Sequence, residues 1–132
     1  MAARVNEWIA AYGRAWEERD AEAAAALFTD DAVYQDHPLG PPHLGSSGVH
    51  KYWSDVTATQ SDVAVQFGSP VVSSDEGRAA VEFWVNMANA GSDVTLTGIL
   101  ILRFEPGGRC EELREAWHFE MGRHDPPAGW GQ

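Results

Sequence analysis

The chain has 132 residues, 44% hydrophobic and 22% charged, which predicts a single globular domain over residues 1–132 with a core of its own. Twenty acidic against nine basic residues give a formal net charge of -11, which argues against nucleic acid and anionic membranes as partners. The single cysteine, Cys110, excludes an internal disulfide and fits a reducing, cytoplasmic setting. No apolar run approaches the ~18–20 residues that span a bilayer.

The first part of the chain predicts helices. An apolar stripe at helical spacing comprises Val5, Trp8, Ile9, Tyr12 and Trp16. Asp20 is placed to cap a second, alanine-rich helix that ends near residues 27–28. Residues 33–36 are then expected to form a short extended segment.

Residues 37–48 contain three prolines and three glycines, so we expect a loop there. Ser46 or Ser47 can cap a third helix that follows this loop. The expected buried face of that helix comprises Val49, Tyr52, Trp53 and Val56.

The second half predicts strands. Apolar residues alternate over residues 63–67 and 79–87, and two longer strands follow over residues 94–104 and 110–121. Turn-forming sequences over residues 75–77, 90–93 and 106–108 separate these four segments. Three helices followed by an antiparallel meander of four or more strands indicate an α+β domain with a pocket between helices and sheet.

Helices can cover only one face of such a sheet. The other face is expected to carry an apolar group that comprises Trp84, Ile99, Ile101 and Ala116. An exposed apolar sheet face favours a homodimer formed through this outer face.

Glu115 is the most informative polar residue. Alternation along the last strand places it in one row with Leu113, Trp117, Phe119 and Met121. A carboxylate in an apolar row must be paired, hydrated or protonated. Glu115 is therefore either a pocket acid with a raised pKa or a structural acid that reaches solvent or pairs with a neighbouring arginine.

Asp36 and Tyr12 are two further candidates. Asp36 shares a strand face with Tyr34 at the start of the loop, where it can either do chemistry or cap a turn. The helical stripe turns Tyr12 inward, and a buried phenol needs a hydrogen-bond partner, which can be a substrate or a core group.

The histidines do not predict a metal centre. His37, His43 and His50 lie near Asp36, but their spacing matches no tight ligand pattern such as His-Glu-x-x-His. We therefore expect no metal, and the sequence contains no phosphate-binding glycine loop or nucleophile elbow.

Three stretches resemble the nuclear transport factor 2-like superfamily, in particular its SnoaL-like and ketosteroid isomerase-like branches. They are residues 20–33, the loop that leads into residues 48–53, and residues 102–117, so the resemblance covers nearly the whole chain. It implies a cone in which a curved antiparallel sheet wraps a long helix around an apolar pocket, often in dimers. These motifs specify a fold that hosts many reactions.

The resemblance to ketosteroid isomerase implies roles for individual residues. It implies that Asp36 is the general base, that Tyr12 binds the oxyanion, and that Trp117 is a pocket tryptophan. The neutral acid that completes the oxyanion site in that enzyme falls on Leu100, so that part of the device is missing here. Glu115 is two residues before Trp117 and can supply a replacement acid. The arginine of the superfamily's epoxide hydrolases has no counterpart on the expected pocket face.

Two functions follow. The first is a cofactor-independent acid–base isomerase, dehydratase or cyclase that acts on a small apolar carbonyl compound through Asp36, Tyr12 and Glu115. The expected pocket walls are Trp16, Trp53, Val81, Phe83, Leu100 and Trp117. The alternative is a non-catalytic small-molecule binder or dimeric interaction module on the same fold. A closed cavity that receives the acids favours the enzyme.

Overall fold

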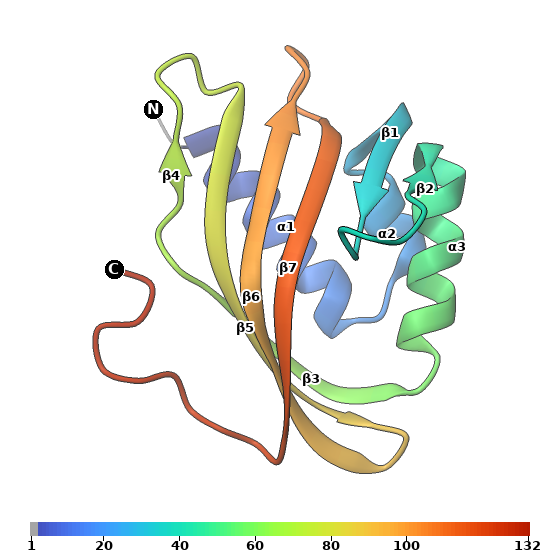
Figure 1. The fold of residues 1–132 in the computed structure, drawn as a ribbon. Helices are drawn as coiled ribbons and strands as arrows, with labels where there is room; N and C mark the ends of the chain where they lie inside the picture. The colour runs from blue at the N-terminus through green and yellow to red at the C-terminus, as the bar shows by residue number, and fades with distance from the viewer. Residues whose placement is uncertain (1–2) are drawn as a thin grey trace.

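Three helices lie against one face of a single twisted sheet in the computed structural model, which describes residues 3–132 (Figure 1). The helices are α1 (Ala3–Glu17), α2 (Ala21–Ala25) and α3 (Gly45–Thr57). The strands are β1 (Phe28–Gln35), β2 (His43–Leu44), β3 (Gln60–Phe67), β4 (Val71–Val72), β5 (Arg78–Asn89), β6 (Ser92–Phe104) and β7 (Cys110–Met121).

The sheet contains the predicted meander and more. Its strand order is β2-β1-β7-β6-β5-β3, with β4 paired to β5 outside this path. The four predicted strands, β3, β5, β6 and β7, pair antiparallel in this order. Strand β1 adds to the other edge of β7 in parallel. The α+β prediction is therefore confirmed, on a wider sheet than the alternation alone indicated.

Helix α1 buries its predicted apolar stripe against the sheet. The Trp8 ring contacts Phe104 edge to face, with ring centroids 5.6 Å apart, and Trp16 lies 6.0 Å from Phe83. The Trp8 Nε1 group donates to the backbone oxygen of Leu27 at 2.9 Å, which satisfies its polar atom. Because burial of a large apolar side chain contributes about 1.5–3 kcal/mol, this aromatic layer stabilises the packing of α1 on the sheet.

Strand β1 is longer than the predicted segment 33–36. Asp20 caps α2 as expected, since its Oδ1 accepts from the Ala23 backbone N–H at 3.0 Å. The helix nevertheless ends at Ala25, and β1 begins at Phe28. Its pairing with β7 is interrupted between Phe28 and Val33, and the exposed acids between them lie in this irregularity. Because Asp30 and Asp31 are typical of turns, the sequence did not predict that the strand begins before residue 33.

The predicted serine cap of α3 is wrong. The helix begins at Gly45, its N-cap residue is Leu44, and no side chain from residues 3–132 caps it. Gly45 has a φ of 74°, which glycine adopts at little cost, and an added Cβ there would lie 2.8 Å from the Asp30 backbone oxygen. Close approach of two backbones, which local spacing does not reveal, sets this helix start.

The outer sheet face is covered in part by the C-terminal segment of the chain. Trp130 packs edge to face on Trp84 at 5.7 Å, and the Trp84 Nε1 group donates to the His124 backbone oxygen at 2.8 Å. Ile99 and Ile101 remain exposed on this face. A homodimer through the outer face stays a prediction. Within residues 3–132 no helix is both long and apolar enough to cross a membrane.

Candidate active site

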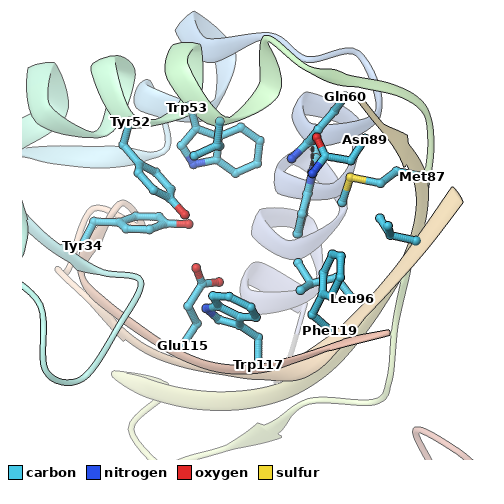
Figure 2. Close-up of a pocket in the computed structure, with 13 residues that line it drawn as sticks. Tyr34, Tyr52, Trp53, Gln60, Met87, Asn89, Leu96, Glu115, Trp117 and Phe119 are labelled. Atoms are coloured by element: carbon cyan, nitrogen blue, oxygen red, sulfur yellow. Dashed lines mark hydrogen bonds between the residues drawn. The ribbon is translucent and has the colours of Figure 1, made fainter. Parts of the chain in front are cut away.

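A cavity of about 280 Å³ lies between α1, α3 and the sheet, and Figure 2 shows it in close-up. Six strands and helices contribute to it in addition to α1. The lining residues are Trp16, Tyr34, Tyr52, Trp53, Val56, Gln60, Met87, Asn89, Val94, Leu96, Glu115, Trp117 and Phe119. An aromatic wall with a few polar groups is typical of small-molecule sites.

The six expected wall residues divide into two groups. Trp16, Trp53 and Trp117 line the cavity. Val81, Phe83 and Leu100 are instead fully buried core residues. They lie on the helix-facing side of their strands, as alternation predicts, but at positions where α1 side chains fill the space. These three residues therefore lie on the predicted face of the sheet, but at positions outside the cavity.

Glu115 lies where the apolar row of β7 meets the cavity. Its cross-strand partner is the buried Leu100, and Figure 2 shows its carboxyl group pointing into the cavity. Neither candidate arginine neutralises it, because Arg103 and Arg114 contact Glu112 at 4.0 and 3.9 Å. Burial, followed by the nearby charge of Asp36, raises the pKa of Glu115 to about 8. A carboxyl group in this range can both give and take a proton near neutral pH.

Three tyrosine hydroxyl groups lie near the Glu115 carboxyl group. Tyr34 on β1 and Tyr52 on α3 line the cavity, and Figure 2 shows both hydroxyl groups pointing toward the region that the Glu115 carboxyl group faces. Tyr12 lies one layer behind and shares a buried hydrogen bond of 2.9 Å with the Tyr34 hydroxyl. Burial, followed by the Glu115 charge, raises the pKa of all three hydroxyls above the ordinary value. They therefore remain protonated donors.

Asp36 lies at the edge of this group and is not among the lining residues. Its Oδ1 is 3.0 Å from the His43 Nε2 atom, and its backbone oxygen accepts from the Trp117 Nε1 group at 2.9 Å. The His43 ring in turn packs on Tyr52 with centroids 4.3 Å apart. Strand β1 ends at Gln35, so Asp36 lies just past the strand, where its charge acts on both Tyr52 and Glu115. Of the three predicted catalytic residues, Glu115 alone lines the cavity.

The histidines near the loop do not gather around a common point. His43 pairs with Asp36, whereas the His37 Nδ1 atom accepts from the Leu39 backbone N–H at 3.2 Å and His50 is exposed on α3. In the described part of the chain, no group of three or more His, Cys, Asp or Glu side chains is arranged to hold a metal ion.

Several lining residues were not predicted as functional. Tyr34 and Tyr52 had a signal, since one shares the face of Asp36 and the other lies on the expected buried face of the third helix. Gln60 and Asn89 had none, because their pairing across β3 and β5 brings them together. Trp53 was expected, but its Nε1 group is buried without a hydrogen-bond partner among residues 3–132.

Comparison with known proteins identifies the fold. The family model described as SnoaL-like domain matches residues 9–113. SalBIII, an epoxide hydrolase/cyclase-like enzyme with a role in pyran ring formation in the polyether salinomycin, is 20% identical with a TM-score of 0.78, over 89% of this chain and 95% of that chain.

Two further solved structures are similar. A hypothetical protein with a ketosteroid isomerase-like fold from Catenulispora acidiphila, in complex with trimethylamine, is 19% identical with a TM-score of 0.74, over 83% of this chain and 84% of that chain. RV0760c from Mycobacterium tuberculosis is 19% identical with a TM-score of 0.79, over 90% and 96% of the respective chains. At sequence identities of 19–20%, these similarities show a shared fold and nothing about activity.

Proposed function

The chain belongs to the SnoaL-like domain family, and from this premise we propose that it is an enzyme that performs general acid–base chemistry on a small, largely apolar carbonyl compound. The observation that carries the proposal is Glu115, a carboxyl group in an aromatic cavity with no ion pair among residues 3–132, whose pKa is raised to about 8 by burial and then by Asp36. Acid–base catalysts work best when their pKa lies near the working pH.

In the proposed reaction Glu115 moves the proton. At pH 7 about one tenth of the Glu115 side chains are carboxylates, given this pKa. The carboxylate takes a proton from the carbon beside the carbonyl group, the C–H electron pair forms a C=C bond, and the carbonyl oxygen takes the negative charge. Glu115 then returns the proton to another carbon in an isomerisation, to a departing hydroxyl group in a dehydration, or to the new alkoxide in an aldol-type cyclisation.

The tyrosines bind the developing oxyanion in this proposal. Tyr34 and Tyr52 reach the cavity with protonated hydroxyl groups, which can donate to the substrate oxygen. Tyr12 was expected to donate directly; in this proposal it instead supports Tyr34, with which it shares a hydrogen bond. When Tyr12 donates to Tyr34, the Tyr34 hydrogen is free to turn toward the substrate. Two donors on one oxygen then replace the acid that is missing at Leu100.

Asp36 acts through its charge in this proposal. It lies outside the cavity wall and is held by His43, so its contribution is to raise the pKa of Glu115. The Trp117 indole N–H donates to the Asp36 backbone oxygen and thereby ties Asp36 to β7, the strand that carries Glu115. No arginine lines the cavity within the described residues, so the proposed chemistry differs from an epoxide opening that depends on one.

Hydrogen–deuterium exchange beside a carbonyl group tests the proposal without knowledge of the natural substrate. The probe is 2-acetyl-6-methoxynaphthalene in D2O, with exchange of the acetyl methyl protons followed by NMR. The protein is expected to accelerate this exchange over buffer, and Glu115→Gln is expected to lower the protein-dependent rate by about 100-fold or more. No acceleration over buffer by the unaltered protein would contradict the proposal.

Asp36→Asn is the companion variant, because its effect distinguishes the role of Asp36 from that of Glu115. If Asp36 acts through its charge, its neutralisation lowers the pKa of Glu115, and the pH profile of exchange moves to lower pH with a maximal rate within about tenfold of the original. A loss of several orders of magnitude at every pH, with an unchanged melting temperature, would instead make Asp36 the base that the family resemblance implies.

A further inference from the structure

The cavity has a second polar region, at the end away from Glu115. Gln60 begins β3 and Asn89 ends β5, and the two are direct cross-strand partners. Figure 2 shows them on the opposite side of the cavity from Tyr34, Tyr52 and Glu115. Two carboxamides at the far end of an aromatic pocket have no use in the proton transfer proposed above.

The orientation of the Gln60 carboxamide is fixed by its neighbour. The Trp16 Nε1 group donates to the Gln60 Oε1 atom at 3.0 Å, and an indole nitrogen can only donate. The oxygen of Gln60 must therefore face Trp16, and its NH2 group is left over. No acceptor within residues 3–132 bonds this NH2 group, although only 9% of the Gln60 residue is exposed.

Other polar groups around the cavity are also donors without acceptors. The oxygen of Asn89 accepts from the Thr59 hydroxyl at 2.7 Å, and its NH2 group has no acceptor in the part of the chain that the structure describes. The Trp53 Nε1 group is buried and has no hydrogen-bond partner among the described residues. A buried donor without an acceptor is costly, as at the Trp53 Nε1 group, and a ligand that supplies acceptors can also satisfy the NH2 groups of Gln60 and Asn89, which line the cavity. The far end is thus chemically matched to oxygen acceptors rather than to a hydrocarbon.

We propose that the far end of the cavity is an acceptor-binding subsite, in which the Gln60 NH2 group, held by Trp16, donates to a second oxygen of the substrate. The inference rests on the proposed function for the near end. The substrate class is then a flat molecule about the size of two fused rings, with a carbonyl group at the Glu115 end and a ketone, ester or ether oxygen at the other. A cavity of about 280 Å³ suits a molecule of this size.

A pair of ligands that differ in one atom tests the subsite. The probes are 2-acetyl-6-methoxynaphthalene and 2-acetyl-6-ethylnaphthalene, in which a CH2 group replaces the ether oxygen. We expect the protein to bind the methoxy compound about 3- to 10-fold more tightly in a fluorescence titration, the worth of one hydrogen bond. Gln60→Met, which keeps the side-chain length and loses the donor, is expected to abolish this preference.

Gln66→Met is the matched control, because Gln66 is exposed on the same strand outside the cavity and its replacement should leave the preference intact. If Gln60→Met does not fold, the Gln60 side-chain NH2 resonances of the unaltered protein provide the readout. They should shift with the methoxy compound and not with the ethyl compound.

The outcomes separate this inference from the proposed function. Equal affinity for the two compounds, or a preference that survives Gln60→Met, would overturn the subsite while acetyl exchange still supported Glu115. A Gln60-dependent preference without any exchange would support the subsite and remove the proposed reaction. Binding of neither compound would overturn the subsite.

Discussion

The interior of the domain has a closed half and an open half that share the same strands. In the closed half the helix-facing residues are solidly packed; they include Val81, Phe83, Leu100, Leu102 and Leu113. In the open half the same rows continue as cavity wall; they include Met87, Asn89, Leu96, Glu115, Trp117 and Phe119. Trp117 and Phe119 are 45% and 46% exposed there, although they continue the row of the fully buried Leu113.

Helix coverage, and not the residue pattern, separates the two halves. Helix α1 ends at Glu17, and Figure 1 shows the paired ends of β5 and β6 extending past it. Trp16, in the last turn of α1, contacts Phe83 on one side and lines the cavity on the other. Glu115 lies at this border, opposite the buried Leu100. The acid is thus desolvated by the closed half and reached by ligands from the open half.

The largest effect should come from a matched pair of phenylalanines. Phe83→Ala removes a fully buried ring and should lower the free energy of unfolding by about 3–5 kcal/mol. Phe119→Ala removes a ring of the same chemistry from the cavity mouth and should cost less than about 1 kcal/mol. Urea denaturation of both variants measures the difference. Similar losses would mean that the cavity is closed in solution and that the two halves do not differ.

The sequence predicts the face of each side chain better than its depth. The alternation of apolar residues correctly predicted that Phe83, Leu100 and Trp117 lie on the helix-facing side of the sheet, because side chains along a strand alternate with a period of two. It could not distinguish wall from core, since this depends on where α1 ends relative to strands far away in the chain. The same limit applies to Asp36, because the strand pattern does not show that β1 ends at Gln35 and that Asp36 is not among the residues that line the cavity.

Polar residues of the site divide in a similar way. Glu115 was found because a carboxylate in an apolar row violates a local pattern. Gln60 was missed because a glutamine at the start of a strand violates none; only the Trp16 contact, 44 positions away, fixes its role. The resemblance to ketosteroid isomerase pointed to Tyr12, whereas the structure has Tyr34 between Tyr12 and the cavity.

The next effect in size is a pH dependence of stability that belongs to Glu115. Its pKa rises from 4.5 to about 8 on folding, through burial and then the charge of Asp36, so between these values the folded protein holds a proton that the unfolded chain loses. The stability that this proton confers is fully present below pH 4.5 and is lost as pH rises through 8. The loss is on the order of 3 kcal/mol, discounted because the open half admits water.

Glu115→Gln should remove this slope. Relative to the unaltered protein, the variant is expected to gain stability between pH 5 and pH 9 while it loses exchange activity, as expected for a strained acid at a functional site. Thermal unfolding at several pH values measures the difference. Glu120→Gln, which changes an exposed carboxylate on the same strand, is the control and should leave the slope in place. Parallel pH curves for Glu115→Gln and the unaltered protein would show that Glu115 is ionised in the folded state.

The smallest effect concerns the bond that joins the two halves. Tyr12 belongs to the closed half and Tyr34 to the cavity wall, and their hydroxyl groups share one buried hydrogen bond of 2.9 Å. Tyr12→Phe and Tyr34→Phe each break it, so each should cost about 1 kcal/mol of unfolding free energy. Their effects on acetyl exchange should differ, because Tyr34 alone reaches the cavity. We expect Tyr34→Phe to lower the exchange rate more than Tyr12→Phe, which removes only the support behind the donor. The reverse order would mean that Tyr12 contacts the substrate oxygen directly. The cavity would then extend past Tyr34 to Tyr12, into the closed half.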